Sequence, residues 1–134
     1  MNIDFYTSKH ALIEQLLSAI ERSIGEGLSE KNVTAVFTVL TKLSSTVNTH
    51  LVSEDTYLYP ELFNSLVPET RRIAALYKDE MLQISDNFRM FVDMFATKES
   101  LLTQKNEFIT YFTALASSLR ERIAREEKEL YKLI

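Results

Sequence analysis

Residues 33–60, VTAVFTVLTKLSSTVNTHLVSEDTYLYP, carry the pattern that decides the fold. Apolar side chains recur there at alternating steps of three and four residues, the spacing of one face of an α-helix. The repeat positions are Val33, Val36, Leu40, Leu43, Val47, His50, Glu54 and Tyr57. The pattern predicts one long amphipathic helix with Ser29 as its N-cap, a loosened turn at Pro60 and an end near residues 64–65.

Three further segments repeat this spacing on either side of the first. The segment before it is Tyr6, His10, Ile13, Leu17, Ile20 and Ile24. The next segment after it is Ala74, Tyr77, Met81, Ile84, Phe88, Phe91 and Phe95. The last segment is Phe108, Phe112, Leu115, Leu119, Arg122, Glu126, Leu130 and Leu133. Each of them predicts an amphipathic helix.

The breaks between these segments are short. Gly25 and Gly27 end the first helix, and Pro68 suits the first turn of the third. The helical pattern weakens over residues 96–100, where a short connection is expected. Four helices joined by short links predict an all-α fold, an up-down-up-down antiparallel four-helix bundle that forms one domain over residues 1–134.

The composition agrees with a bundle and excludes other classes. With two Gly and two Pro in 134 residues, the chain lacks the turn residues that a β-sandwich or doubly wound sheet needs. Without cysteine it has no disulfides, iron–sulfur clusters or thiol nucleophile. A net charge of −4 without a basic block argues against nucleic-acid binding. No apolar run approaches membrane-spanning length and no signal peptide is visible, so we expect a cytoplasmic protein with no membrane contact.

Five positions on the apolar faces are polar. They are His10, His50, Glu54, Arg122 and Glu126. Counted along antiparallel helices, they fall at one level of the bundle together with Met81. A buried unpaired charge costs several kcal/mol, and breaking a buried ion pair costs about 3–5 kcal/mol. The charged and polar groups of this layer must therefore be paired with one another or with a bound ion. Either a metal ion binds the imidazoles and carboxylates, or Arg122 bridges Glu54 and Glu126 in a metal-free network.

Three motifs surround these residues. Asp4-Phe5-Tyr6 precedes His10, His50-x3-Glu54 runs into Leu58-Tyr59-Pro60, and Arg122-x3-Glu126 runs into Leu130-Tyr131. In these motifs the chain resembles the hemerythrin-like (HHE cation-binding) domains over nearly its whole length. The resemblance implies a four-helix bundle around two irons bridged by two carboxylates. Histidines of the first two helices hold one iron, and histidines of the last two helices hold the other.

The resemblance is incomplete at the second iron. His10 and His50 match the ligands of the first iron, and Glu54 and Glu126 match the bridging carboxylates. Met81, which follows Glu80, stands where the third helix should offer a histidine, and Arg122 stands where the fourth should. The resemblance therefore implies at most one metal ion per chain, with iron favoured and manganese or zinc as alternatives. Arg122 takes the place of the second cation and is expected within salt-bridge reach of Glu54 or Glu126.

Two functions follow from this ligand set. The first is a degenerate hemerythrin-like domain that binds one divalent metal ion through His10, His50, Glu54 and Glu126 for sensing or storage. The alternative is a metal-free interaction or regulatory module with a protein partner, a homodimer included. An oxidase at a remnant iron is the weakest reading, so no enzyme and no catalytic residue is expected.

The remaining aromatic residues are expected to be structural. Tyr6, Tyr57 and Tyr77 are interpreted as core aromatics close to the polar layer. A second set is interpreted as the core of the opposite end of the bundle. This set comprises Phe88, Phe91, Phe95, Phe108, Tyr111 and Phe112.

Overall fold

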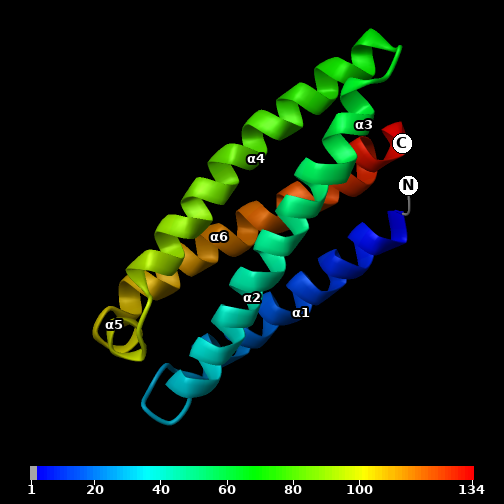
Figure 1. The fold of residues 1–134 in the computed structure, drawn as a ribbon. Coiled ribbons are helices and arrows are strands. Elements are labelled where there is room, and N and C mark those ends of the chain that lie inside the picture. The colour runs from blue at the N-terminus through cyan, green and yellow to red at the C-terminus, as the bar shows by residue number, and fades with distance from the viewer. Residues whose placement is uncertain (1–2) are drawn as a thin grey trace.

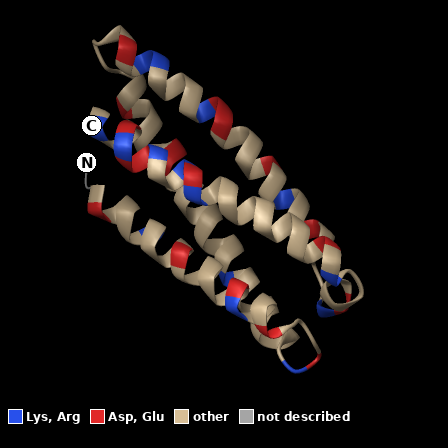
Figure 2. Cartoon of the chain, turned by 180° about the vertical axis from the view of Figure 1, so that it is seen from behind, with Lys and Arg blue, Asp and Glu red and all other residues tan. Residues whose placement is uncertain are grey.

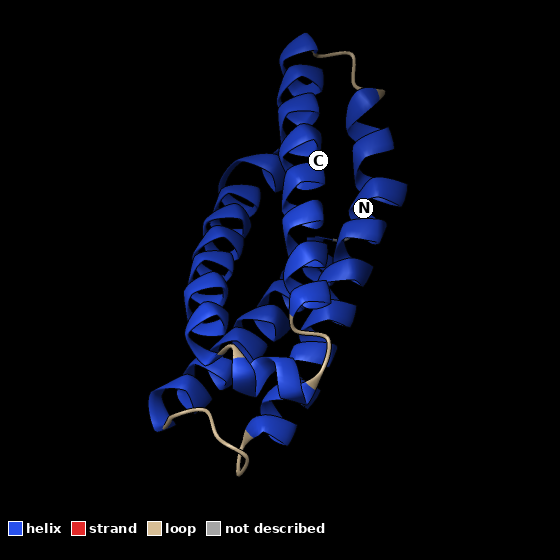
Figure 3. Ribbon diagram, turned by 90° about the vertical axis from the view of Figure 1, so that its left-hand side faces the viewer, coloured by secondary structure: helices blue, strands red, loops and turns tan. Residues whose placement is uncertain are grey.

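The four amphipathic segments form four long helices that run along the molecule, with both termini at one end (Figure 1). The computed structural model describes residues 3–134, which are helical apart from short loops and contain no strand (Figure 3). The elements are α1 (Ile3–Glu26), α2 (Val33–Ser53), η1 (Glu54–Leu58), α3 (Tyr59–Phe63), α4 (Pro68–Met94), α5 (Lys98–Thr103), α6 (Lys105–Arg125), η2 (Glu126–Leu130) and η3 (Tyr131–Leu133). The expected all-α bundle is confirmed. Within residues 3–134, no helix combines the length and the apolar character needed to cross a bilayer.

The N-cap residue predicted for α2 is wrong. α1 ends at Glu26, and Gly27 follows with φ of 93°, a backbone conformation that favours glycine. The residue that precedes α2 is Asn32, not Ser29. The Asn32 side chain accepts a hydrogen bond from the Ser29 N–H and donates one to the Gly27 carbonyl, both at 2.9 Å. Asn32 thus closes the loop, and Ser29 begins a turn that the sequence pattern does not distinguish from a cap.

The connection after α4 is shorter than expected. Residues 95–97 form the link, and α5 already begins at Lys98, inside the expected connection at 96–100. A capping box starts this helix, because the Thr97 hydroxyl accepts the Ser100 N–H at 3.0 Å and the Ser100 hydroxyl accepts the Thr97 N–H at 3.2 Å. Leu101 is fully buried and anchors α5 across the end of the bundle opposite the termini (Figure 1).

The core has two apolar clusters with a polar layer between them. The larger cluster fills the α5 end and includes Ile13, Val47, Phe88 and Leu119. The smaller cluster lies toward the termini and contains Tyr6, Leu58, Tyr59, Leu62, Ala74, Tyr77, Met81, Leu130 and Tyr131. The expected phenylalanine core is confirmed for all five phenylalanines, whereas Tyr111 is 49% exposed and does not belong to it.

Two π-helical turns border the polar layer and shift the side-chain register beyond it. In η1 the Tyr59 N–H donates to the Glu54 carbonyl, five residues earlier, and the loosened turn expected at Pro60 is therefore confirmed. The extra residue of a π-turn moves the next apolar position by one. Leu58 is consequently buried, and the expectation that Tyr57 is a core residue is wrong because its side chain is 65% exposed.

Candidate metal centre

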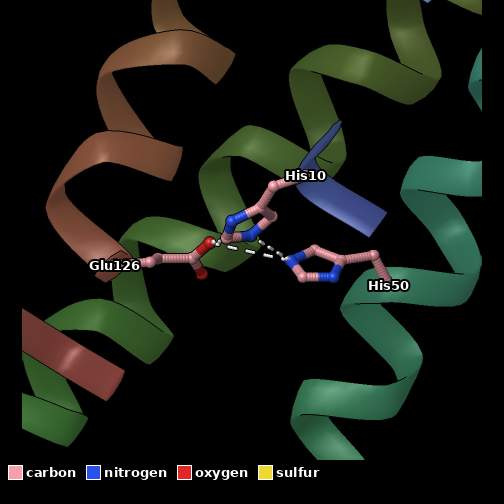
Figure 4. A group of neighbouring side chains, drawn as sticks. All are labelled: His10, His50 and Glu126. Atoms are coloured by element: carbon pink, nitrogen blue, oxygen red, sulfur yellow. Dashed lines mark hydrogen bonds and ion pairs between the residues drawn. The ribbon is translucent and has the colours of Figure 1, made fainter. Parts of the chain in front are cut away.

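Four helical segments each bring a polar side chain into the layer. His10 comes from α1 and His50 from α2, while Glu54 and Glu126 are the first residues of η1 and η2. None of these four residues, nor Arg122, is more than 5% exposed. Figure 4 shows His10, His50 and Glu126 pointing toward one another from three separate helices. The predicted convergence of the five polar positions is thus confirmed.

The donor atoms in this layer are spaced like ligands around one ion. His10 Nε2 lies 3.1 Å from His50 Nε2 and 3.1 Å from Glu126 Oε1. His50 Nε2 lies 3.6 Å from Glu126 Oε1 and 3.6 Å from Glu54 Oε1. Two donors about 2.1 Å from a common metal ion lie roughly 3.0 Å apart at a right angle and roughly 3.4 Å apart at the tetrahedral angle. The two spacings of 3.1 Å lie within that range, and the two of 3.6 Å lie slightly above it.

Two buried atoms of the layer lack a hydrogen-bond partner. Among the described residues these are Glu54 Oε1 and His50 Nδ1. An unsatisfied buried polar atom costs about 1–3 kcal/mol. Glu54 Oε1 faces the imidazole nitrogen of His50, which is where a cation would provide its missing partner. The donor set therefore fits a metal ion.

The other ring nitrogen of His10, Nδ1, contacts a carboxylate at the protein surface. His10 Nδ1 lies 3.3 Å from Oε1 of Glu127, whose side chain is 45% exposed. A carboxylate on Nδ1 orients an imidazole so that Nε2 faces the ion, the usual arrangement around protein metal sites. Glu127 was not singled out from the sequence, because it is one of several charged residues at the end of α6.

Tyr131 is a member of the layer that the sequence pattern did not identify. Its hydroxyl donates to Glu54 Oε2 at 2.9 Å and lies 3.0 Å from His10 Nε2 and 3.4 Å from Glu126 Oε1. Burial, followed by the charges of Glu126 and Glu54, raises the pKa of this phenol far above its usual value. A signal for it exists in the sequence, because Glu54–Tyr59 and Glu126–Tyr131 both read Glu-x3-Leu-Tyr.

Arg122 occupies the other side of the layer. Its Nε lies 3.3 Å from Glu126 Oε2, which confirms the predicted salt bridge, and its Nη2 donates to the Tyr59 hydroxyl at 2.8 Å. Its Nη1 lies 3.4 Å from Glu80 Oε2, and its guanidinium carbon lies 4.7 Å from the centre of the Tyr77 ring. The expectation that Arg122 bridges both glutamates is wrong for Glu54. Arg122 pairs with Glu126, and the hydroxyl of Tyr131, not the guanidinium of Arg122, donates to Glu54.

The two buried glutamates are held in different states. Burial, reinforced by the neighbouring Glu126 charge, raises the pKa of Glu54 well above its ordinary value. Burial acts on Glu126 in the same direction, but hydrogen bonds from His10 and His50 and the charge of Arg122 outweigh it and lower the pKa of Glu126. Without a metal ion, Glu126 is therefore the anion of the layer and Glu54 favours its protonated form.

Met81 and Tyr77 lie next to the layer as space-filling residues. Met81 is 5% exposed and packs in the apolar cluster toward the termini, as expected. The Tyr77 hydroxyl donates to the Arg125 carbonyl at 3.2 Å, and burial raises its pKa to about 12. Arg125 in turn makes two hydrogen bonds to Glu80, at 2.8 and 3.0 Å.

A helical bundle with buried histidines and carboxylates converging at one point defines a candidate cation-binding protein. The family model of the hemerythrin HHE cation-binding domain matches residues 1–134. The chain therefore belongs to this family, as its motifs indicate. The comparisons with curated proteins and with solved structures gave no match.

Proposed function

We propose that this protein binds one divalent metal ion, iron in preference to manganese or zinc, through His10, His50, Glu54 and Glu126. The observation that carries the proposal is the spacing of the donor atoms, because His10 Nε2, His50 Nε2 and Glu126 Oε1 lie 3.1–3.6 Å from one another. Glu54 Oε1, a buried oxygen without a hydrogen-bond partner, lies 3.6 Å from His50 Nε2. Two imidazoles and two carboxylates are a donor set suited to ferrous iron, and they leave further coordination positions open. Bound iron would supply a redox-active centre inside the bundle.

A second metal ion is opposed by the other half of the layer. The guanidinium of Arg122 lies 3.3 Å from Glu126 Oε2, so a fixed positive charge already pairs with the carboxylate that a second ion would need. On the neighbouring helix Met81 offers only a weak thioether ligand. Charge repulsion and missing imidazoles therefore act together against a second site. This is the sense in which we propose that the site is degenerate.

The role that we propose is sensing or storage of the ion rather than catalysis. Each of the four proposed ligands is at most 4% exposed. The hollow beside His10, about 330 Å³, lies between α1 and α6 and is lined partly by Glu14, Arg120 and Glu127. A surface hollow of this kind would give an ion access to His10, and the burial of the four ligands favours a small ion over an organic substrate as the bound species.

A metal-free interaction module is the second candidate. One observation favours it, because Arg122, Tyr59 and Tyr131 already satisfy most of the polar atoms in the layer. The partner would then be another protein, a second copy included. Positive and negative residues are interspersed along the helices (Figure 2), which does not favour nucleic acid as the partner.

Anaerobic titration of the metal-free protein with ferrous iron distinguishes the two candidates. We expect one tightly bound ion, lost in His10→Ala and in His50→Ala. Met81→Leu is the matched control, a buried substitution of similar volume beside the layer that leaves iron binding unchanged. Absence of binding by the unmodified chain would favour the interaction module, and equal binding by the histidine variants would contradict the assigned ligands.

A further inference from the structure

We propose that the phenolate oxygen of Tyr131 is a fifth protein ligand of the metal ion. The inference rests on the metal binding proposed above and extends it to a residue type that is not among the four proposed ligands, His10, His50, Glu54 and Glu126. It also predicts a property that histidines and carboxylates alone do not give, a phenolate-to-ferric charge-transfer band in the visible spectrum.

The Tyr131 hydroxyl lies among the donor atoms. It is 3.0 Å from His10 Nε2, 2.9 Å from Glu54 Oε2 and 3.4 Å from Glu126 Oε1. These separations of 2.9–3.4 Å are close to the roughly 3.0–3.4 Å expected between two donors on one metal ion. An ion that touches His10 and both carboxylates therefore lies within reach of the phenol oxygen as well.

The backbone of η2 holds the tyrosine in this position. The Tyr131 N–H donates to the Glu126 carbonyl, so the π-turn places the fifth residue after Glu126 one full turn above it. In an α-helix of 3.6 residues per turn, the same residue would point about 140° away from Glu126. The wider turn is thus what directs both side chains into the layer.

Ring packing fixes the orientation of the side chain. Tyr131 is 2% exposed, and its ring stacks on His10 with centroids 5.5 Å apart and planes 17° apart. The Tyr6 ring packs against it with a centroid distance of 5.4 Å. A ligand held in this way needs no rearrangement to reach the ion.

Coordination by Tyr131 balances as a simple exchange. The O–H bond of the phenol breaks, a metal–oxygen bond forms, and the phenol proton is released to water, in addition to the proton that Glu54 loses when it binds the ion. No atom changes oxidation state in this step. The hydroxyl has one proton but two carboxylate oxygens within 3.4 Å, so its replacement by a cation satisfies both of them together.

Tyr59 supplies a matched control within the same protein. It ends the other Glu-x3-Leu-Tyr motif, follows the other π-turn and is fully buried. Its hydroxyl, however, accepts a hydrogen bond from Arg122 Nη2 at 2.8 Å, on the side of the layer that holds the guanidinium. Tyr59→Phe therefore removes an equivalent hydroxyl without removing the proposed ligand.

The test is to load the unmodified chain, Tyr131→Phe and Tyr59→Phe with ferric nitrilotriacetate. Excess complex is removed by gel filtration, bound iron is counted, and the visible spectrum is recorded. We expect a phenolate-to-ferric charge-transfer band in the unmodified chain and in Tyr59→Phe. Tyr131→Phe should lack this band and bind iron at least about tenfold more weakly.

The outcomes separate this inference from the metal binding on which it rests. Bound ferric iron without a visible band, or a band that survives in Tyr131→Phe, overturns the role of Tyr131 and leaves the single metal site intact. Retention of ferrous but not ferric iron also overturns it, because a phenolate ligand favours the ferric ion. Retention of neither ion overturns the proposed metal binding itself. If Tyr131→Phe does not fold, resonance Raman spectra of the unmodified chain decide, because excitation in the band must enhance phenolate ring vibrations.

Discussion

Replacing Arg122 with Met should strongly destabilise the metal-free protein. Arg122 is 5% exposed, and the carboxylate with which it pairs at 3.3 Å, Glu126, is 1% exposed. The substitution leaves this carboxylate in the bundle interior without its cation, and it also removes the hydrogen bond donated to the Tyr59 hydroxyl at 2.8 Å. Methionine retains much of the apolar length of the side chain, so the effect measured is that of the charge and of this hydrogen bond.

The expected loss follows from these contacts. Breaking a buried ion pair by removing one partner costs about 3–5 kcal/mol. Glu126 keeps its contacts with His10 and His50, which favours the lower half of that range. In a domain of this size each kcal/mol lowers Tm by roughly 3–5 °C, so Tm should fall by about 10–20 °C.

Arg125→Met is the control for Arg122→Met. Arg125 lies three residues further along the helix and also bonds Glu80, but its side chain is 42% exposed and that of Glu80 is 40% exposed. Its removal should cost less than about 1 kcal/mol. Both variants are compared with the unmodified chain by urea and thermal unfolding in the presence of a chelator. A loss in Arg122→Met no larger than that in Arg125→Met would refute the role assigned to the buried guanidinium.

Two further outcomes are expected away from the layer. Hydrogen bonds from Arg120 lower the pKa values of Glu14 and Glu21 in the folded chain. These ion pairs therefore stabilise the fold above the ordinary carboxylate pKa, and this stabilisation is lost as the pH falls through the folded-state pKa values. In Arg120→Ala, the free energy of unfolding measured in urea should consequently fall less on acidification than it does in the unmodified chain. Gly27→Ala should destabilise the fold by about 1–2 kcal/mol, because φ at Gly27 is 93°. Gly25 lies inside α1 and an added Cβ there would meet nothing within 4 Å, so Gly25→Ala should be neutral or stabilising. Thermal unfolding measures both effects.

The helices and the buried layer were predictable because both depend on side-chain periodicity. His10, His50, Glu54, Arg122 and Glu126 were identified only by their spacing, and all five are buried. The spacing holds from the first turn of each helix to the layer, so the level at which the helices meet also follows from counting residues.

The structure departs from the sequence-based prediction at the two π-turns. A π-turn depends on burial and on hydrogen bonds five residues apart, such as Tyr131 N–H to the Glu126 carbonyl, which apolar periodicity does not encode. Tyr57 lies within η1, where the wider turn buries Leu58 in its place, and Tyr59 and Tyr131 directly follow the two π-turns, which is why their contacts were missed. Glu80 was missed for another reason, because a half-exposed residue beside an apolar position reads as an ordinary surface residue.

The measurement that tests the central claim most directly is the number of metal ions bound per chain. Metal-free protein is dialysed to equilibrium against ferrous iron without oxygen, and iron and protein are then quantified in the same sample by elemental and amino-acid analysis. The geometry of His10, His50, Glu54 and Glu126, with Arg122 beside them, predicts one ion per chain. Two tightly bound ions, or none, would contradict it.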